Sequence, residues 1–133
     1  MTFEKLQRFL QEIPFNNHVG IRLVRLYQDG VSLECRLRPE LMNGSGVLHG
    51  GVIATVADVA VGMALSRHSG RPRAGATVEL KINYLRPVAQ GKITARSHLV
   101  KVGKLLCCGR VEIFDAEKRA VAAALITYII FNE

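Results

Sequence analysis

The sequence predicts an α+β fold in which one long buried helix is wrapped by a curved antiparallel sheet of about six strands. Residues 52–65 are almost entirely apolar, which is typical of a helix that is buried on every side. Most of the other segments alternate apolar and polar residues, the pattern of strands with one buried face. A chain of 133 residues supports one sizeable core, so we expect a single domain over residues 1–133.

The other expected elements follow from residue spacing and from turn residues. Residues 2–12 have apolar side chains at helical spacing and precede Pro14, which predicts a short N-terminal helix followed by a loop over residues 15–20. Asp29-Gly30 predicts a two-residue hairpin turn. Short connections favour antiparallel pairing of neighbouring strands. The expected strands are residues 21–26, 31–38, 76–85, 92–102, 104–114 and 119–131.

The apolar helix carries one ionisable side chain, Asp58, near its middle. Its 14 residues are too few to cross a bilayer, which takes roughly 20, so we expect a core helix. A buried carboxylate without a partner is costly, and Asp58 is therefore expected to have a functional role or a specific partner. One sheet cannot cover a helix that is apolar all round, so a second copy of the chain is expected to cover the remaining flank.

Composition and charge restrict the possible partners. The net charge of +7 favours an anionic ligand, whereas the scattered basic residues do not favour nucleic acid. Three cysteines without regular spacing, and no apolar leader at the N-terminus, lead us to expect a cytoplasmic protein without disulfides or a membrane association. No group of residues has the spacing of metal ligands, and Cys107 is expected to be an ordinary strand residue.

The segment before the helix combines glycines with the free backbone N–H groups of a helix N-terminus. Asn43-Gly44-Ser45-Gly46 is followed by His49-Gly50-Gly51, where a ligand can approach the backbone closely. Such N–H groups can stabilise the oxyanion that forms on an acyl group. Asp58 lies eight residues beyond Gly50, about 12 Å along a helix at 1.5 Å per residue. A site that uses both groups therefore needs two subunits.

The spacing from Asn43 through His49-Gly50-Gly51 to Asp58 resembles the active-site signature of hotdog-fold acyl-CoA thioesterases, most closely the phenylacetate-pathway (PaaI-like) branch. The segment ELKINYLRP, which ends at Pro87, supports this resemblance, and the similarity extends over nearly the whole chain. The family fold is a long helix wrapped by an antiparallel sheet, paired into homodimers and commonly into homotetramers. The resemblance implies hydrolysis of an acyl- or aroyl-CoA to the free acid and coenzyme A, with no cofactor beyond the coenzyme A of the substrate.

The resemblance also implies residue roles at the subunit interface. Asp58 would act as general base or nucleophile, and the N–H of Gly50 in the partner subunit would polarise the thioester carbonyl. Asn43 would hold the thioester or the water, His49 would support that end of the site, and Thr77 would help to position the water. The candidates for binding the coenzyme A portion are Gly51, Arg86, Lys101 and Lys104.

The sequence is compatible with two alternative functions. Hydration or dehydration of an acyl thioester occurs on the same fold, but it normally needs a differently arranged pair of His and acid. A non-catalytic acyl-CoA-binding or sensing module has no evident need for a buried Asp58. The sequence leaves open the acyl group, the choice between nucleophile and base for Asp58, and the choice between dimer and tetramer.

Overall fold

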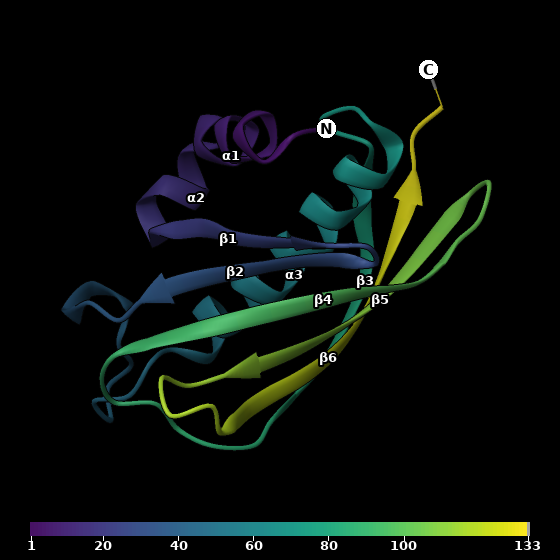
Figure 1. Ribbon diagram of the computed structural model, residues 1–133. Helices are drawn as coiled ribbons and strands as arrows, with labels where there is room; N and C mark the ends of the chain where they lie inside the picture. Colours follow the sequence, from purple (N-terminus) through teal and green to yellow (C-terminus); the bar gives the residue numbers. More distant parts are fainter. Residues whose placement is uncertain (133) are drawn as a thin grey trace.

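The computed structural model describes residues 1–132, and in them a six-stranded antiparallel sheet curves around one long helix (Figure 1). This is the architecture predicted from the sequence. The helical elements are α1 (Phe3–Glu12), α2 (Pro14–Val19), the short 3-10 helix η1 (Pro39–Leu41) and α3 (Gly50–Ser69). The strands are β1 (Ile21–Tyr27), β2 (Gly30–Arg36), β3 (Gly75–Tyr84), β4 (Lys92–Val102), β5 (Leu106–Phe114) and β6 (Ala120–Ile130).

The sheet order is β1-β2-β4-β5-β6-β3, and every neighbouring pair is antiparallel. Two of the pairs, β2 with β4 and β3 with β6, join strands that are not consecutive in the chain. The strand bounds differ from the predicted ones by at most two residues at either end. This order leaves β1 and β3 as the two edges of the sheet, with α1 packed beside β1 and α3.

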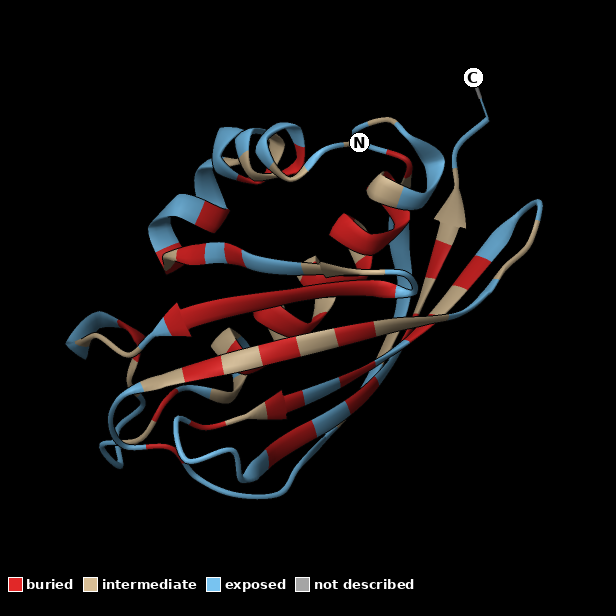
Figure 2. Cartoon of the chain, in the orientation of Figure 1, coloured by how far each residue is buried: buried red, intermediate tan, exposed pale blue. Residues whose placement is uncertain are grey.

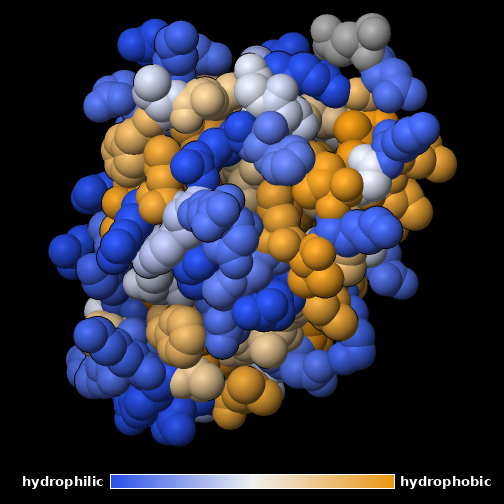
Figure 3. Space-filling view, turned by 45° about the vertical axis from the view of Figure 1, so that its right-hand side comes forward, coloured by the Kyte–Doolittle hydropathy of each residue, from blue (hydrophilic) through white to orange (hydrophobic). Residues whose placement is uncertain are grey.

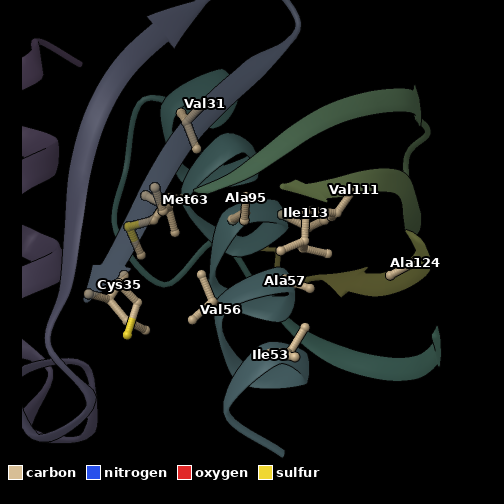
Figure 4. Packing of buried hydrophobic residues seen from close by; sticks show 14 of the residues in the cluster. Val31, Cys35, Ile53, Val56, Ala57, Met63, Ala95, Val111, Ile113 and Ala124 are labelled. Carbon is tan, nitrogen blue, oxygen red and sulfur yellow. The ribbon is translucent and has the colours of Figure 1, made fainter. Parts of the chain in front are cut away.

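The core lies between α3 and the concave face of the sheet. Figure 2 shows buried residues concentrated on β2, on alternate positions of β4, β5 and β6, and on one side of α3. In the close view, Val56 and Ala57 of α3 lie among Ala95 of β4 and Ile113 of β5 (Figure 4). All four residues are fully buried or nearly so. The contact is dense because alanine at several helix positions lets α3 approach the sheet closely.

Helix α3 has 20 residues and extends beyond both ends of the 14-residue apolar run. It begins after His49, whose side chain caps the first turn, and ends at Gly70, which adopts the left-handed conformation. By length and composition α3 is therefore able to cross a membrane, and the expectation that it is too short is wrong. Half of its most apolar stretch is nevertheless buried within the chain, as in a core helix.

In the single chain the sheet leaves one flank of α3 uncovered, as predicted from the apolar run of residues 52–65. Thr55, Asp58, Val59 and Gly62 are only partly buried, and their spacing places them on one stripe of the helix. The sheet covers the opposite side of α3, so this stripe stays accessible. Asp58 therefore lies at a partly open surface and not within the core.

Two local predictions are corrected by the structure. Residues 15–20 are not a loop, since Pro14 starts α2 and left-handed Gly20 ends it. The hairpin turn is formed by residues 28–29, and Gly30 is the first residue of β2. A Cβ atom on Gly30 would lie 1.9 Å from the carbonyl oxygen of Ser97, so this glycine lets β2 approach the backbone of β4.

The edge strand β3 is poorly covered. Val78 and Tyr84 of β3 and Leu85, which follows it, are each more than half exposed, although all three have large apolar side chains. A long apolar edge strand exposes unpaired backbone groups that can pair with another chain. A second exposed apolar area lies on the side that holds β5 and β6 (Figure 3), where Leu106 and Leu125 are about half exposed.

Candidate functional site

The Asp58 carboxylate is held by two hydroxyl groups from the sheet. The Thr77 hydroxyl on β3 donates to Asp58 Oδ1 at 2.7 Å. The Tyr128 hydroxyl on β6 lies 3.0 Å from the same Oδ1 and 2.9 Å from the backbone carbonyl oxygen of Asp58. Within residues 1–132, Asp58 Oδ2 has no hydrogen bond. The carboxylate thus has one fixed oxygen and one that is free to react.

The sheet register explains why these groups meet. Thr77 pairs directly with Tyr128 across β3 and β6, so both side chains point to the same concave face. Helix α3 crosses this face, which brings Asp58 onto the pair. Sequence reasoning identified Thr77 but missed Tyr128, because Tyr128 lies 70 residues from Asp58 in the chain. The available signal was an aromatic side chain with a polar tip in a mostly aliphatic strand, since such a side chain commonly needs a hydrogen-bond partner when it is buried.

Burial, together with the negative charge of Asp58, raises the pKa of the Tyr128 phenol well above its ordinary value. Tyr128 therefore keeps its proton at neutral pH and remains a hydrogen-bond donor. Burial also raises the pKa of the Cys107 thiol, to about 11. Cys107 is consequently a protonated thiol near neutral pH and is not an activated nucleophile.

An apolar pocket of about 340 Å³ lies next to this carboxylate. Val59 and Gly62 of α3, together with Tyr128, form the wall nearest Asp58. Phe9 of α1 and Ile13, which follows α1, form the opposite wall. Most of the lining is apolar and suits an aliphatic or aromatic group, with Asn16, Ser66 and Arg73 as its polar members.

The N-terminus of α3 has one backbone donor that is not used. His49 Nδ1 accepts a hydrogen bond from the N–H of Gly51 at 2.8 Å, which requires an unprotonated Nδ1. The Tyr84 hydroxyl donates to the carbonyl oxygen of Gly50 at 2.7 Å. The N–H of Gly50 has no acceptor within the described part of the chain. Gly50 thus provides an N–H donor at the positive end of the helix dipole.

The loop before α3 is fixed by Asn43. Its Oδ1 accepts from the backbone N–H groups of Ser45 and Val47, at 2.8 and 3.2 Å. This use of Oδ1 leaves the side-chain NH₂ of Asn43, which is exposed, as the group that can contact a ligand. Asn43, His49 and Gly50 therefore form one cluster at the start of α3.

The structure does not bring this cluster and Asp58 together within one chain. Gly50 and Asp58 are separated by eight residues of the same helix, about 12 Å. Their partners Tyr84 and Thr77 lie correspondingly near opposite ends of β3. A single protomer thus contains two half-sites, one with the N–H donor and one with the carboxylate.

The basic residues selected from the sequence are also divided. Arg86 follows the end of β3 that holds Tyr84, whereas Lys101 and Lys104 lie at the β4–β5 connection, toward the opposite end of the sheet. All three side chains are exposed. Among residues 1–132, no three His, Cys, Asp or Glu side chains are placed to hold a metal ion, and the absence of a metal remains a prediction.

Comparison with known proteins agrees with the geometry. Residues 45–122, which include both half-sites except Asn43 and Tyr128, match the family described as the thioesterase superfamily. The chain belongs to the thioesterase superfamily. The resemblance seen in the sequence is therefore confirmed at the level of the family.

Individual relatives cover almost the whole chain. The medium/long-chain acyl-CoA thioesterase YigI of Escherichia coli K12 is 32% identical, over 93% of this chain and 90% of YigI. A crystal structure of a thioesterase from Haemophilus influenzae has a TM-score of 0.88 at 25% identity and covers 99% of this chain and 92% of its own. A mutant of the phenylacetic acid degradation protein PaaI from Thermus thermophilus shares the fold, with a TM-score of 0.81 at 22% identity, over 90% of this chain and 100% of PaaI.

Proposed function

We propose that this thioesterase superfamily member hydrolyses the thioester of an acyl-CoA, with Asp58 as the reacting carboxylate. The observation that carries this proposal is the free Oδ2 of a carboxylate whose Oδ1 is fixed by Thr77 and Tyr128, beside an apolar pocket. Hydrolysis needs a positioned carboxylate and a donor for the developing oxyanion. The relation to an E. coli acyl-CoA thioesterase supports the same substrate class.

In the general-base form of the mechanism, Asp58 takes a proton from water while the water oxygen bonds to the thioester carbonyl carbon. The oxyanion accepts a hydrogen bond from the N–H of Gly50, and the C–S bond then breaks. The proton passes to the sulfur, which leaves as the coenzyme A thiol. In the nucleophilic form, Asp58 attacks the carbonyl carbon itself, the C–S bond breaks and coenzyme A leaves as the thiolate. Water then hydrolyses the resulting anhydride to the free acid and the Asp58 carboxylate, and the proton that the water releases passes to the thiolate.

Both forms require two protomers, and the open edge of β3 offers a way to pair them. If two β3 strands pair antiparallel about a two-fold axis between Leu80 and Lys81, Thr77 of one strand faces Tyr84 of the other. Since Thr77 contacts Asp58 and Tyr84 contacts Gly50, this pairing brings the carboxylate of one protomer toward the N–H of its partner. The exposed apolar residues of β3 support such a homodimer.

The same pairing suits the coenzyme A portion of the substrate. In the paired sheets, Arg86 of one protomer would lie at the same end as Lys101 and Lys104 of the other protomer. Positive charge collected at one end of the sheet favours the phosphate groups of coenzyme A. Asn43, His49 and Gly51 would then line the entrance near the thioester. A second pair of protomers, packed on the apolar outer face of β5 and β6, would give a tetramer.

The acyl chain is proposed to occupy the apolar pocket between α1 and α3. Its volume of about 340 Å³ and its lining favour a medium or long acyl chain over a small polar one. The relative YigI is a medium/long-chain acyl-CoA thioesterase, which supports the same preference here.

Release of thiol from short, medium, long-chain and aromatic acyl-CoAs tests the function. Asp58→Asn keeps the size of the side chain but cannot accept the proton, so turnover is expected to fall by at least about 10²-fold. Binding of acyl-CoA, measured by calorimetry, should persist. Glu12→Gln is the control, because this acid is exposed at the end of α1 and should leave turnover unchanged.

Two outcomes would contradict the proposal. Equal thiol release by wild type and Asp58→Asn would exclude Asp58 as the reacting group. Binding of acyl-CoA without release from any thioester would favour the non-catalytic module.

A further inference from the structure

Gly62 is an unusual residue for its position in α3. It lies well inside a 20-residue helix, where glycine is about 1 kcal/mol less favourable than alanine. Its backbone does not have a positive φ, so no special conformation requires glycine. A Cβ atom at this position would lie 2.7 Å from the hydroxyl oxygen of Tyr128 and 3.3 Å from the adjacent ring carbon. The approach of the Tyr128 hydroxyl therefore accounts for the glycine.

The Tyr128 hydroxyl reaches past Gly62 to the preceding turn of the helix. It lies 2.9 Å from the backbone carbonyl oxygen of Asp58 and 3.0 Å from Oδ1 of the same residue. Each hydroxyl carries one proton, so Tyr128 donates to one of these oxygens at a time. The ring is buried, and β6 fixes its position in register with Thr77.

Two donors on one oxygen restrict the orientation of a carboxylate. Thr77 approaches Oδ1 from β3, and Tyr128 approaches it from β6. Rotation of the Asp58 side chain would break both contacts, so Oδ2 is directed away from the sheet. Hydrogen bonds to a charged acceptor are stronger than neutral ones, which makes this arrangement effective on a partly exposed side chain.

We propose that Tyr128 is a positioning residue for the Asp58 carboxylate, and that position 62 is glycine so that the Tyr128 hydroxyl can reach it. The proposal rests on the proposed function, since it presumes that Asp58 reacts. Gly62 and Tyr128 act as one unit, in which the small residue on the helix makes room for the hydroxyl on the strand.

The variants Tyr128→Phe and Gly62→Ala and the double variant test this unit. Tyr128→Phe keeps the ring and removes the hydroxyl, so kcat is expected to fall about tenfold while KM changes less than about twofold. Tyr27→Phe is the matched control, since Tyr27 lies on β1 against Arg96 and far from Asp58.

Gly62→Ala should displace the Tyr128 hydroxyl and lower both kcat and the melting temperature. In the double variant no hydroxyl remains to collide with the alanine. Its kcat should therefore equal that of Tyr128→Phe, and the alanine should lower the melting temperature less in the double variant than it does beside the intact Tyr128. Such strong non-additivity is expected only if the two residues act through one contact.

Two results would overturn the proposal. One is a Tyr128→Phe variant with wild-type kcat and KM, whatever its melting temperature. The other is Gly62→Ala lowering stability equally with and without the Tyr128 hydroxyl. Asp58→Asn separates this failure from failure of the proposed function. If Asp58→Asn is inactive and Tyr128→Phe is fully active, only the positioning role of Tyr128 is contradicted. If Asp58→Asn is fully active, Asp58 is not the reacting carboxylate, and the proposed function itself is contradicted.

Discussion

The proposed oxyanion donor, the backbone N–H of Gly50, can be removed by a single substitution. Gly50 is the first residue of α3, directly after the capping residue His49. Proline is well accepted at this helix position, because the N–H there has no partner within the helix. His49 already has the extended backbone that proline requires of the residue before it, with φ −62° and ψ 133°. The N–H can therefore be removed without disturbing the helix.

Gly50→Pro is expected to lower kcat by about 10² to 10³, the effect of losing one oxyanion donor. Gly50→Ala is the control, because it keeps the N–H. Both variants add a Cβ atom 3.1 Å from the Tyr84 ring, which must shift slightly in each case. Thiol-release assays of the two variants separate the contribution of the donor from the steric effect. Equal losses in both variants would contradict the assigned donor.

At the scale of elements, α3 contributes to both half-sites and forms one wall of the pocket. Its buried side packs against the sheet, and its accessible stripe carries Asp58 and Val59. Helix α1 lies beside β1 and α3 and supplies the facing wall of the pocket. The distance between these two helices thus limits the length of the acyl chain that can be bound.

Ile13→Phe is expected to narrow this pocket from the side of α1 without touching Asp58. Excluding about two methylene groups, at about 0.8 kcal/mol each, corresponds to a loss of about tenfold in kcat/KM for the longest chains. Short acyl groups should be hydrolysed as before. Val24→Phe, at an exposed position of β1, is the matched control. If Ile13→Phe lowered kcat/KM equally for all acyl-chain lengths, the acyl group would not occupy this pocket.

At the scale of the whole molecule, the division of the site between protomers follows from the geometry of α3. A straight helix keeps Gly50 and Asp58 about 12 Å apart in every conformation that preserves it. The exposed β3 edge allows a symmetric pairing in which each protomer supplies one group to each of two sites. Activity is therefore expected to depend on assembly.

Mixing two inactive variants tests this dependence directly. Asp58→Asn retains the Gly50 donor, and Gly50→Pro retains the Asp58 carboxylate. A mixed dimer would contain one complete site and one doubly defective site, so refolding the two together in equal amounts should restore about a quarter of wild-type activity. Each variant refolded alone is the control. No recovery, with mixed dimers verified by mass spectrometry, would contradict a site shared between protomers.

Much of the fold could be predicted from the sequence because the relevant signals are local. The alternating strands, the apolar run of residues 52–65 and the glycines before Asp58 depend on neighbours within a few residues. The same signals indicated Asp58 and the N–H of Gly50 as parts of a site, whereas Thr77 followed only from the family resemblance. They failed where a residue serves a distant partner, as Gly30 does by allowing β2 to approach Ser97 of β4.

The sequence by itself determined the six strands and the two longer helices, the uncovered helix flank and the separation of Gly50 from Asp58, because each depends on spacing along one segment. Only the tertiary structure decided that β3 forms an edge beside β6, since strand order depends on connections that spacing does not encode. It also decided that Tyr128 contacts Asp58 and that Gly62 makes room for this contact. These contacts join residues far apart in the chain, and only the register of the sheet against the helix brings them together.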